Sequence, residues 1–220
     1  MPSPIADRMS FAQELASVLP AGLPHRDMVI AKAARHLELI VEANQYLNLT
    51  RITTPREAAI KHVLDCVIPW ELFAAATRVL DAGAGAGFPG VPLALLLPGT
   101  RFTLAESIQK KARFLDAAVD ALDLANVQVE AHRAEDVLKR QRIDLITARA
   151  LAPLVKTLDL FGPALKSGVR VLLFKGPDVE TEITAAAVQA RSYRVRVSVV
   201  ARYDLPDALG SRTIVEMVKA

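Results

Sequence analysis

The sequence predicts an α/β fold: a doubly wound parallel sheet with an antiparallel edge strand, preceded by a small helical region. Three observations predict it. Short apolar strands alternate with helical segments after Arg78, which is typical of a parallel sheet covered on both faces. A glycine-rich turn follows the first of these strands. The first 76 residues contain only helical patterns.

Residues 1–76 are predicted to form a helical cap. A short helix is expected at 11–19, where a stretch rich in proline and glycine ends it. From 27 to 47, apolar residues recur three and four positions apart, the period of a helix. Thr54, Pro55 and Glu57 predict the start of a further helix, with the threonine as N-cap, the proline at the first position and the glutamate at the third.

Residues 77–220 are predicted to form a second domain that contains the sheet. Strands are expected at 78–81, 102–105, 127–131, 143–147 and 169–174. Helices are expected at 92–97, 109–122, 154–165 and 180–191. No helix pattern separates the last two strands, at 193–200 and 213–218. These two strands therefore predict an antiparallel hairpin at the edge of the sheet.

Length and charge limit the classes of protein that fit. The 220 residues are enough for about one and a half average domains. The net charge of +3 excludes a histone-like polycation, although a basic face can exist within a small total charge. Residues 1–76 contain seven basic and eight acidic residues, and residues 77–220 contain 20 and 16. The single cysteine, Cys66, excludes an intrachain disulfide and a zinc site of several cysteines, and we expect no metal.

The start of the chain predicts a cytoplasmic protein. Residues 1–8 contain no apolar stretch of the kind found in secretory signals, and the first six are expected to be disordered. The apolar run at 91–97 is much shorter than the roughly 20 residues that cross a bilayer. We therefore expect a reducing compartment and no membrane partner.

The glycine-rich turn is the strongest functional signal. Four glycines occur within eight residues at the end of a strand: Gly83, Gly85, Gly87 and Gly90. A dinucleotide fingerprint has the spacing G-x-G-x-x-G, but here the third glycine comes one residue early and Phe88 takes its place. Asp81 lies two residues before the first glycine. This pattern suits S-adenosylmethionine, which has no pyrophosphate. A tight turn without a ligand is disfavoured, since so many glycines cost conformational entropy.

Two further segments bear on the same ligand. Glu106 ends the next strand, 19 residues after Gly87, where a carboxylate is expected to hold ribose hydroxyls. Ala134 and Glu135 follow the strand at 127–131 and would lie near the adenine. The alternative for this second segment is a helix start with acidic residues at the positive end of its dipole. The spacing alone leaves both interpretations open.

Several segments of the sequence resemble one known family. Residues 80–92 resemble the signature of the bacterial 16S ribosomal RNA guanine-N7 methyltransferases, called the RsmG or GidB family. The other matching segments are Asn48–Thr50, His62–Asp65, Lys110–Leu115, Thr147–Ala150 and Phe174–Gly176. The resemblance covers nearly the whole chain, in order. Ala82, Ala84 and Cys66 depart from the family pattern, which usually has Val, Thr and Ser there.

The resemblance implies a Rossmann-like class I methyltransferase that transfers a methyl group from S-adenosylmethionine to N7 of a guanosine in 16S rRNA. Its partner would be that RNA or the small ribosomal subunit, and we expect a monomer. The resemblance places five residues around the cofactor: Gly83, Phe88, Ala134, Glu135 and Arg149. The residue arguments above add Asp81, Gly85, Gly87 and Glu106.

The chemistry of N7 predicts no catalytic acid or base. This nitrogen has a free lone pair and no proton, so positioning should supply most of the rate. Four residues are candidates near the substrate: Arg149, Lys175, His62 and Asp65. Each has a structural alternative: a surface ion pair for the arginine, an ordinary strand-end lysine, and a hydrogen-bonded helix pair for the histidine and aspartate. The aspartate is also a candidate for offsetting the charge of the cationic product.

Other residues leave the mode of RNA binding open. Basic clusters at 110–113 and 191–196 could contact phosphates or form solvated faces. Trp70 and Tyr46 are expected in the core rather than as base-stacking platforms. Two other functions remain as alternatives: a methyltransferase of the same fold with a non-RNA substrate, and a non-catalytic ribosome assembly factor. The intact glycines and Glu106 argue against the second.

Overall fold

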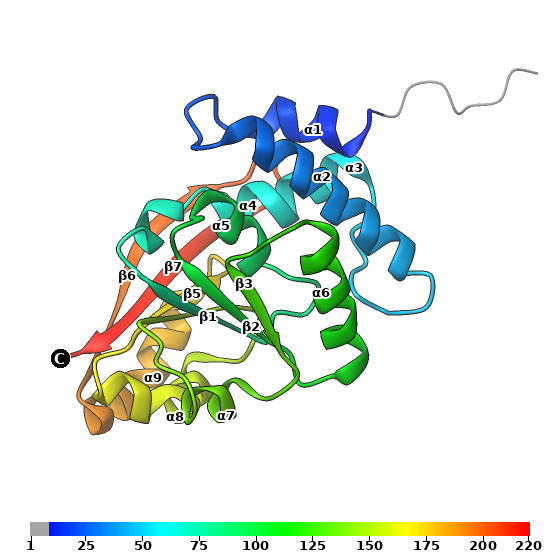
Figure 1. Cartoon of the computed structure of the whole chain (residues 1–220). Helices are drawn as coiled ribbons and strands as arrows, with labels where there is room; N and C mark the ends of the chain where they lie inside the picture. The colour runs from blue at the N-terminus through cyan, green and yellow to red at the C-terminus, as the bar shows by residue number, and fades with distance from the viewer. Residues whose placement is uncertain (1–8) are drawn as a thin grey trace, which may run out of the picture.

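The computed structural model describes residues 9–220, and the expected disorder of residues 1–6 lies outside them. Seven strands form one sheet in the order β3-β2-β1-β4-β5-β7-β6 (Figure 1). Strands β1 to β5 are parallel, and β7 runs antiparallel between β5 and β6. The doubly wound sheet and its antiparallel edge are thus confirmed. The strands are β1 (Arg78–Ala82), β2 (Arg101–Ala105), β3 (Val127–Glu130), β4 (Leu145–Arg149), β5 (Arg170–Lys175), β6 (Val195–Asp204) and β7 (Ser211–Lys219).

The described part of the chain before β1 contains helices joined by loops and no strand. Its elements are α1 (Phe11–Val18), α2 (Arg26–Ala43), α3 (Pro55–Ala58), the π-helical turn η1 (Ala59–Leu64), α4 (Asp65–Val67) and the 3₁₀ turn η2 (Trp70–Phe73). Thr54 is the N-cap of α3 as expected, and Pro55 is the first residue, but the threonine side chain makes no capping hydrogen bond. Helix α3 continues directly through η1 into α4, and this segment carries two of the candidate site residues.

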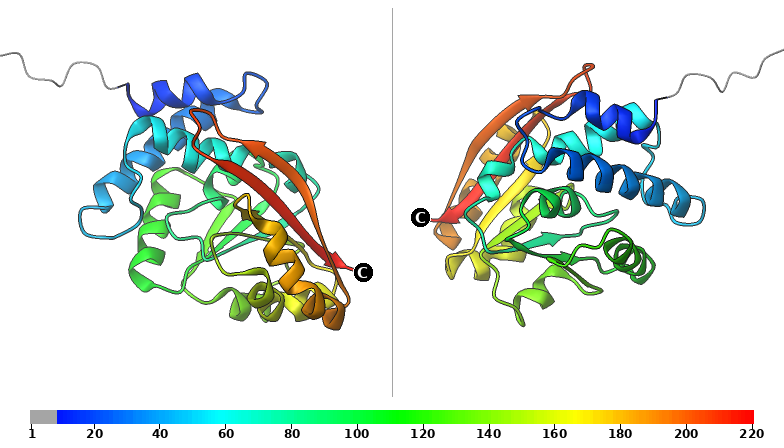
Figure 2. Two further views of the ribbon diagram at one scale, coloured as in Figure 1. Left: turned by 180° about the vertical axis from the view of Figure 1, so that it is seen from behind. Right: turned by 45° about the horizontal axis from the view of Figure 1, so that its top comes forward.

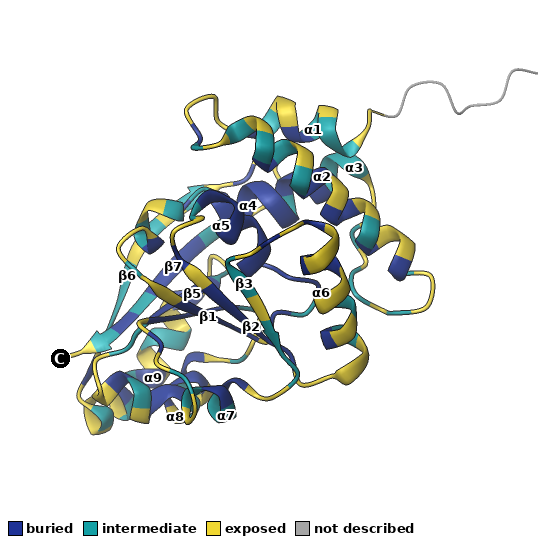
Figure 3. Ribbon diagram, in the orientation of Figure 1, coloured by how far each residue is buried: buried dark blue, intermediate teal, exposed yellow. Residues whose placement is uncertain are grey.

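Helices cover both faces of the sheet. Those after β1 are α5 (Gly90–Leu96), α6 (Gln109–Ala121), α7 (Ala134–Leu138), α8 (Leu154–Lys166) and α9 (Val179–Tyr193). Alternate residues of each parallel strand point to opposite faces. Leu80 and Ala82 pack in the core under α7, α8 and α9, whereas Val79 lies in the core on the side of α5. Figure 3 shows β1 and β2 largely buried between these layers, whereas β3 at the edge of the sheet is partly exposed.

The N-terminal helices share a hydrophobic core with the sheet. Leu15, Ile40 and Val63 belong to the same buried cluster as Val91 and Leu104. Burial of apolar surface in this cluster links the two parts of the chain, since each contributes side chains that the other keeps from water. The core therefore continues across the boundary predicted at residue 76, and the division into two domains stays a prediction.

The edge hairpin also contacts the N-terminal helices. Figure 2 shows the tip of the hairpin formed by β6 and β7 beside these helices. Arg56 in α3 donates from Nε to Asp207 Oδ2 at 2.7 Å, at the tip of the hairpin. Residues that are 151 positions apart in the sequence thus meet at this point. No helix within residues 9–220 has the length and apolar character needed to cross a membrane.

The two aromatic residues expected in the core differ in how far they are buried. Trp70 is partly buried and packs against two core clusters. Tyr46 is 77% exposed, so the expectation that it belongs to the core is wrong. Helix α2 ends at Ala43, and the helical period that would have turned Tyr46 inward does not extend to it. Tyr46 lies in the loop that follows.

Candidate functional site

The glycine-rich turn lies where the strand order reverses, between β1 and β4. In an open parallel sheet this is the point where ligands bind, at the carboxyl ends of the strands. The turn connects β1 to α5. Gly85 has a φ of +59°, which L side chains rarely adopt, and a Cβ built there meets nothing closer than the Gly83 carbonyl oxygen at 3.9 Å. The turn thus leaves open space beside Gly85.

Glu106 joins this turn to the loop after β2. The Glu106 side chain is buried, and its Oε2 accepts a hydrogen bond from the Gly85 backbone N–H at 3.1 Å. Its Oε1 accepts from the N–H of Ile108 at 2.8 Å. The carboxylate predicted to face ribose hydroxyls therefore lies directly against the glycine turn. Because two backbone donors hold it, its position is fixed without a ligand.

Asp81, the residue before the last one of β1, holds the far end of the glycine turn by a hydrogen bond. It is fully buried, and its Oδ2 accepts from the N–H of Gly90 at 2.8 Å. Its other oxygen, Oδ1, has no hydrogen-bond partner in the described structure, nor does Oγ1 of Thr147, its partner in the β1–β4 register. Burial raises the pKa of Asp81 to about 7, against the Gly90 N–H and the charge of Arg149, which lower it.

These features fit S-adenosylmethionine. Buried polar atoms normally have partners, so the two unpartnered oxygens of Asp81 and Thr147 are consistent with a group that would complete them. Glu106 supplies a carboxylate, and the turn at Gly85 allows close approach to backbone. The ligand contains hydroxyls, an amine and a sulfonium, all of which acidic oxygens favour. The assignment of these residues to the cofactor stays a prediction.

Ala134 and Glu135 begin α7, with Ala134 buried and Glu135 half-buried. Both Glu135 and Asp136 lie in the first turn of this helix, where acidic side chains interact favourably with the helix dipole. Glu135 also borders a separate cavity of about 770 Å³, together with Arg78 and Asp144. The structure thus confirms that a helix starts here, which was one of the two interpretations of the sequence. The other, a contact with the cofactor, stays a prediction.

Phe88, at the end of the glycine turn, is the centre of a stack. Its buried ring lies parallel to the ring of His62, with centroids 4.6 Å apart and an interplanar angle of 7°. The guanidinium carbon of Arg149 lies 5.2 Å from the centroid of the Phe88 ring, within the range of a cation–π contact. His36 of α2 packs on the same ring at 5.1 Å. Residues from α2, η1, the turn and β4 thus meet on one phenyl ring.

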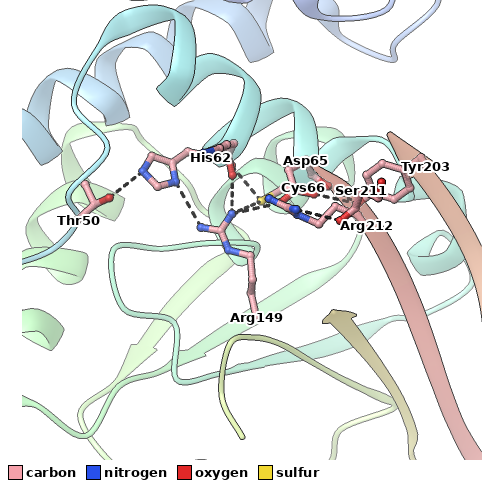
Figure 4. A network of polar contacts seen from close by, with 9 residues as sticks. Thr50, His62, Asp65, Cys66, Arg149, Tyr203, Ser211 and Arg212 are labelled. Atoms are coloured by element: carbon pink, nitrogen blue, oxygen red, sulfur yellow. Dashed lines mark hydrogen bonds and ion pairs between the residues drawn. The ribbon is translucent and has the colours of Figure 1, made fainter. Parts of the chain in front are cut away.

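Arg149, the last residue of β4, is anchored to the η1–α4 segment (Figure 4). Its Nη1 donates to the carbonyl oxygen of Lys61 at 2.6 Å and lies 3.6 Å from Oδ2 of Asp65. Its Nη2 lies 3.4 Å from Nδ1 of His62. The acceptor carbonyl belongs to a π-helical turn, a geometry that is frequent at functional sites. The guanidinium is therefore held in one orientation.

Asp65 balances the positive charge of two arginines. The aspartate is buried, and its Oδ2 accepts from Arg212 Nε at 3.1 Å as well as facing Arg149. Its Oδ1 accepts from the hydroxyl of Tyr203 at 3.0 Å. The carboxylate expected to offset a cationic product is thus already engaged with chain partners. In this structure it orients the two arginines.

One cavity brings the four substrate candidates together. It has a volume of about 620 Å³, and its lining includes Arg149, Lys175, His62 and Asp65. The cavity is next to the glycine turn, because Leu151 also lines it and a Cβ at Gly83 would lie 3.0 Å from Leu151 Cδ1. The basic clusters at 110–113 and 191–196 do not line it.

Lys175 is held in the wall of this cavity. Its Nζ donates to the carbonyl oxygen of Ala152 at 2.8 Å and to Oε2 of Glu182 at 2.7 Å. An ammonium has three donors, so one remains for another partner.

The sequence analysis did not identify Arg212 and Tyr203, which reach Asp65 from the edge hairpin. Both strands contain several polar residues, so no local pattern distinguished these two.

The buried groups of the site have shifted pKa values. Burial, with a further contribution from the charge of Arg149, lowers the pKa of His62 to about 3. Burial lowers the pKa of His36 to about 4, partly offset by the backbone of Ala86, and neither ring nitrogen makes a hydrogen bond of normal geometry in the described structure. Burial also raises the pKa of the Cys66 thiol, which donates to the His62 carbonyl oxygen at 2.9 Å. Both histidines are therefore neutral at pH 7.

The neutral histidines predict that acid destabilises the protein. Between about pH 4 and 6.5 the unfolded chain binds a proton on each histidine that the folded chain does not, so stability falls by about 1.4 kcal/mol per pH unit per histidine as pH falls. Asp81 opposes one of them, because its carboxyl stays protonated in the folded state up to about pH 7. The net slope is about 1.4 kcal/mol per pH unit.

The variant His36→Leu is expected to flatten this slope, since it removes one of the two histidine contributions. Urea unfolding at several values between about pH 4.5 and 6 measures it. Val188→Leu, which changes an exposed side chain that does not titrate, is the control and should keep the wild-type slope. An unchanged slope in His36→Leu would show that His36 is charged in the folded state.

Comparison with known proteins identifies relatives over almost the whole chain. The family model GidB, described as rRNA small subunit methyltransferase G, matches residues 29–208. A protein of Solibacter usitatus named Ribosomal RNA small subunit methyltransferase G is 63% identical over 95% of this chain and 100% of its own length. A protein of the same name from Symbiobacterium thermophilum is 42% identical over 82% of this chain and 78% of its own length.

Solved structures support the fold. An O-methyltransferase from Bacillus cereus, in complex with SAH, has a TM-score of 0.59 at 19% identity and covers 96% of this chain and 98% of its own. A putative O-methyltransferase from Klebsiella pneumoniae has a TM-score of 0.60 at 14% identity and covers 94% of each chain. These likenesses show a Rossmann-like methyltransferase fold. The family match over residues 29–208 and the 63% identity to the Solibacter usitatus protein show that this chain belongs to the GidB family, the rRNA small subunit methyltransferases G.

Proposed function

We propose that this chain transfers a methyl group from S-adenosylmethionine to N7 of a guanosine in the 16S rRNA of the small ribosomal subunit. The family membership and the names of its relatives support methylation of this RNA. The observation that carries the proposal is the cavity beside the glycine turn, whose wall holds several basic side chains. Guanine presents two acceptors, O6 and N7, on one edge, and arginine or lysine donors match them.

The cofactor would be held by the glycine turn and the carboxylates around it. Glu106 would accept hydrogen bonds from ribose hydroxyls, and Gly85 would let the backbone approach. When bound, S-adenosylmethionine supplies a methyl group on a positively charged sulfur. Leu151 would lie between the turn and the cavity, because it lines the cavity and a Cβ at Gly83 would contact it.

The guanine would be positioned by the basic residues of the cavity. Arg149 and Arg212 each keep about a fifth of the side chain exposed, and Lys175 has a donor left. The edge of guanine that carries N7 lies in a deep, narrow groove of an RNA helix. The target base would therefore lie in a loop, or be turned out of its stack, to enter the cavity.

The protonation states in the cavity suit attack by N7. The lone pair of this nitrogen is free, so the reaction needs no group to remove a proton. Asp65 and Glu182 are both paired with basic side chains, and the low pKa of His62 makes it a poor base. Fixed orientation of the base by a rigid wall can supply the rate.

The proposal includes a monomer. The exposed large apolar residues within 9–220 are few and lie on separate elements, so they form no extended apolar surface. Sedimentation of the purified chain at micromolar concentration tests this part.

A labelling experiment tests the proposed reaction. The protein is incubated with methyl-labelled S-adenosylmethionine and small ribosomal subunits that lack the modification, the naked 16S RNA, or neither. We expect label in the RNA, at a residue where alkali or borohydride with aniline cleaves the chain, as for a cationic purine. Label only in protein would contradict an RNA substrate, and label that resists such cleavage would contradict N7.

A further inference from the structure

We infer that Tyr46 and the basic start of α6 bind a single-stranded segment of the RNA substrate next to the target guanosine. Tyr46 would stack on a base, and Lys110 and Arg113 would contact phosphates. This inference rests on the proposed function, and it adds a second RNA contact outside the cavity. It starts from the observation that contradicted the sequence expectation: Tyr46 is 77% exposed.

The loop that carries Tyr46 is fixed at its base. Oδ1 of Asn44 accepts hydrogen bonds from the N–H groups of Leu49 and Thr50, at 2.9 and 3.1 Å. The Asn44 amide also donates to the Thr50 carbonyl oxygen at 2.8 Å. Three hydrogen bonds from one side chain therefore close the loop around the exposed tyrosine. A ring held on a fixed loop loses little conformational entropy when a base stacks on it.

A groove of about 540 Å³ lies beside this tyrosine. It runs between the end of α2 and α6, with Leu39, Tyr46 and Leu47 on one side. Lys110, Arg113 and Phe114 line the other side. The surface thus combines an exposed aromatic ring and apolar side chains with two cationic ones. This is the combination that binds single-stranded nucleic acid, by stacking of bases and neutralisation of phosphates.

The charges of the groove favour an anionic occupant. Lys110 and Arg113 are exposed, and neither forms an ion pair with an acidic side chain within residues 9–220. The acidic residue that lines the groove is Glu42, and it faces Arg35 at 3.3 Å. The groove therefore has two positive charges available and an aromatic ring beside them. A nucleotide chain matches both features, and an acidic peptide matches only the first.

Two contacts link the segments on either side of the groove to residues of the cofactor turn. On one side, the N–H of Ile108 is held by Glu106, so α6 begins directly after the carboxylate that binds the glycine turn. On the other side, Oγ1 of Thr50 lies 3.0 Å from Nε2 of His62, which stacks on Phe88 (Figure 4). An RNA segment in the groove would therefore lie beside the reaction site.

Substitution of the tyrosine tests the stacking contact. In methyl transfer to small ribosomal subunits, Tyr46→Ala is expected to raise the KM for the subunit about tenfold and to change kcat less than about twofold, because stacking of a base on an aromatic ring contributes about that much to binding. Tyr46→Trp should restore the wild-type KM. Tyr46→Ala should bind S-adenosylmethionine and unfold as the wild type does, since its side chain is exposed.

Charge reversal tests the phosphate contacts. The variant K110E/R113E is expected to reduce the slope of log affinity against log salt by about 1 to 2 for a single-stranded RNA of about 12 nucleotides. The matched control is K166E/K219E, which reverses two exposed charges at the ends of α8 and β7, away from the cofactor turn. This control should keep the wild-type slope.

Three outcomes would overturn the inference. One is a wild-type KM in Tyr46→Ala. Another is an equal loss of salt dependence in both charge variants. The third is a defect of Tyr46→Ala on assembled subunits with unchanged binding of the short single-stranded RNA, which would point to a ribosomal protein as the partner. Failure of the proposed function would give a different result, because the wild type itself would then transfer no methyl group to RNA.

Discussion

Replacing Gly85 by aspartate is expected to abolish binding of S-adenosylmethionine while the protein stays folded. Gly85 leaves open space where the ligand is proposed to lie, and a Cβ there meets no atom closer than 3.9 Å. The new side chain would fill this space and place a second carboxylate close to Glu106, whose Oε2 accepts from the Gly85 N–H. Steric exclusion and like charge should together weaken binding at least about 100-fold. This factor corresponds to a loss of about 2.8 kcal/mol of binding free energy.

The fold should tolerate this change. The φ of Gly85 is +59°, and aspartate adopts this left-handed region more readily than most residues do. The strain costs about 1 kcal/mol, which lowers the unfolding temperature by a few degrees. Calorimetric titration with S-adenosylmethionine measures the affinity, and thermal unfolding measures the stability.

The control for this prediction is Gly99→Asp. Gly99 lies in the turn before β2, where a Cβ added to it would have no atom within 4 Å, and its φ is ordinary. This variant adds the same charge and should bind S-adenosylmethionine as the wild type does. Normal binding by Gly85→Asp would show that the ligand does not contact the glycine turn.

Replacing Asp65 by asparagine is expected to cause the largest loss of stability. The carboxylate is 1% exposed and faces Arg149 and Arg212, at 3.6 and 3.1 Å. Asparagine keeps the size of the side chain and an oxygen for the Tyr203 hydroxyl, but it leaves two partly buried guanidinium groups without their shared counter-charge. Breaking a buried ion pair from one side costs about 3–5 kcal/mol, which corresponds to a fall of about 10 °C in the unfolding temperature.

Asp207→Asn is the matched control for the aspartate. Asp207 pairs with Arg56 at 2.7 Å, but both side chains are about half exposed. An exposed pair contributes at most about 1 kcal/mol, so this variant should unfold close to the wild-type temperature. Equal stability of Asp65→Asn and the wild type would show that the ion pairs of Asp65 contribute no net stability.

The activity of Asp65→Asn distinguishes a positioning role from a purely structural one. Asp65 orients Arg149 and Arg212, which face the cavity proposed for the guanine. At a temperature where the variant is fully folded, we expect kcat to fall at least about tenfold, as misplaced reacting groups cost rate, with an unchanged affinity for S-adenosylmethionine. A variant that is only less stable would keep its kcat there.

Local patterns in the sequence predicted the order of the strands, but they did not assign helix α7 between β3 and β4. The alternation of strands and helices after Arg78 predicted the parallel sheet, and the missing helix between the last two strands predicted the antiparallel edge. The glycine turn and Glu106 were predicted to lie together because the carboxyl ends of neighbouring parallel strands meet at one edge. The hydrogen bond from the Gly85 N–H to Glu106 shows that they do.

Local patterns failed where an element ended. Tyr46 was expected in the core, but α2 ends at Ala43 and the tyrosine lies exposed in the loop that follows. The sequence contains a signal that comes close to the answer, since Asn44 and Asn48 are of a type that is frequent at helix ends and in turns. Which side chain closes the loop depends on three hydrogen bonds of Asn44 that spacing does not reveal.

The sequence by itself determined the order of the chemical groups along the chain: the glycine turn, the acid after β2 and the arginine at the end of β4. Only the tertiary structure decided what these residues touch. Asp65 lies 138 residues from Tyr203 and 147 from Arg212, and hydrogen bonds join them across the edge hairpin. The period of apolar residues shows which face of a helix or strand is buried, and therefore whether a given residue on that element points inward or outward. Contacts between charged groups depend on how separate elements pack, and packing is set by the whole core.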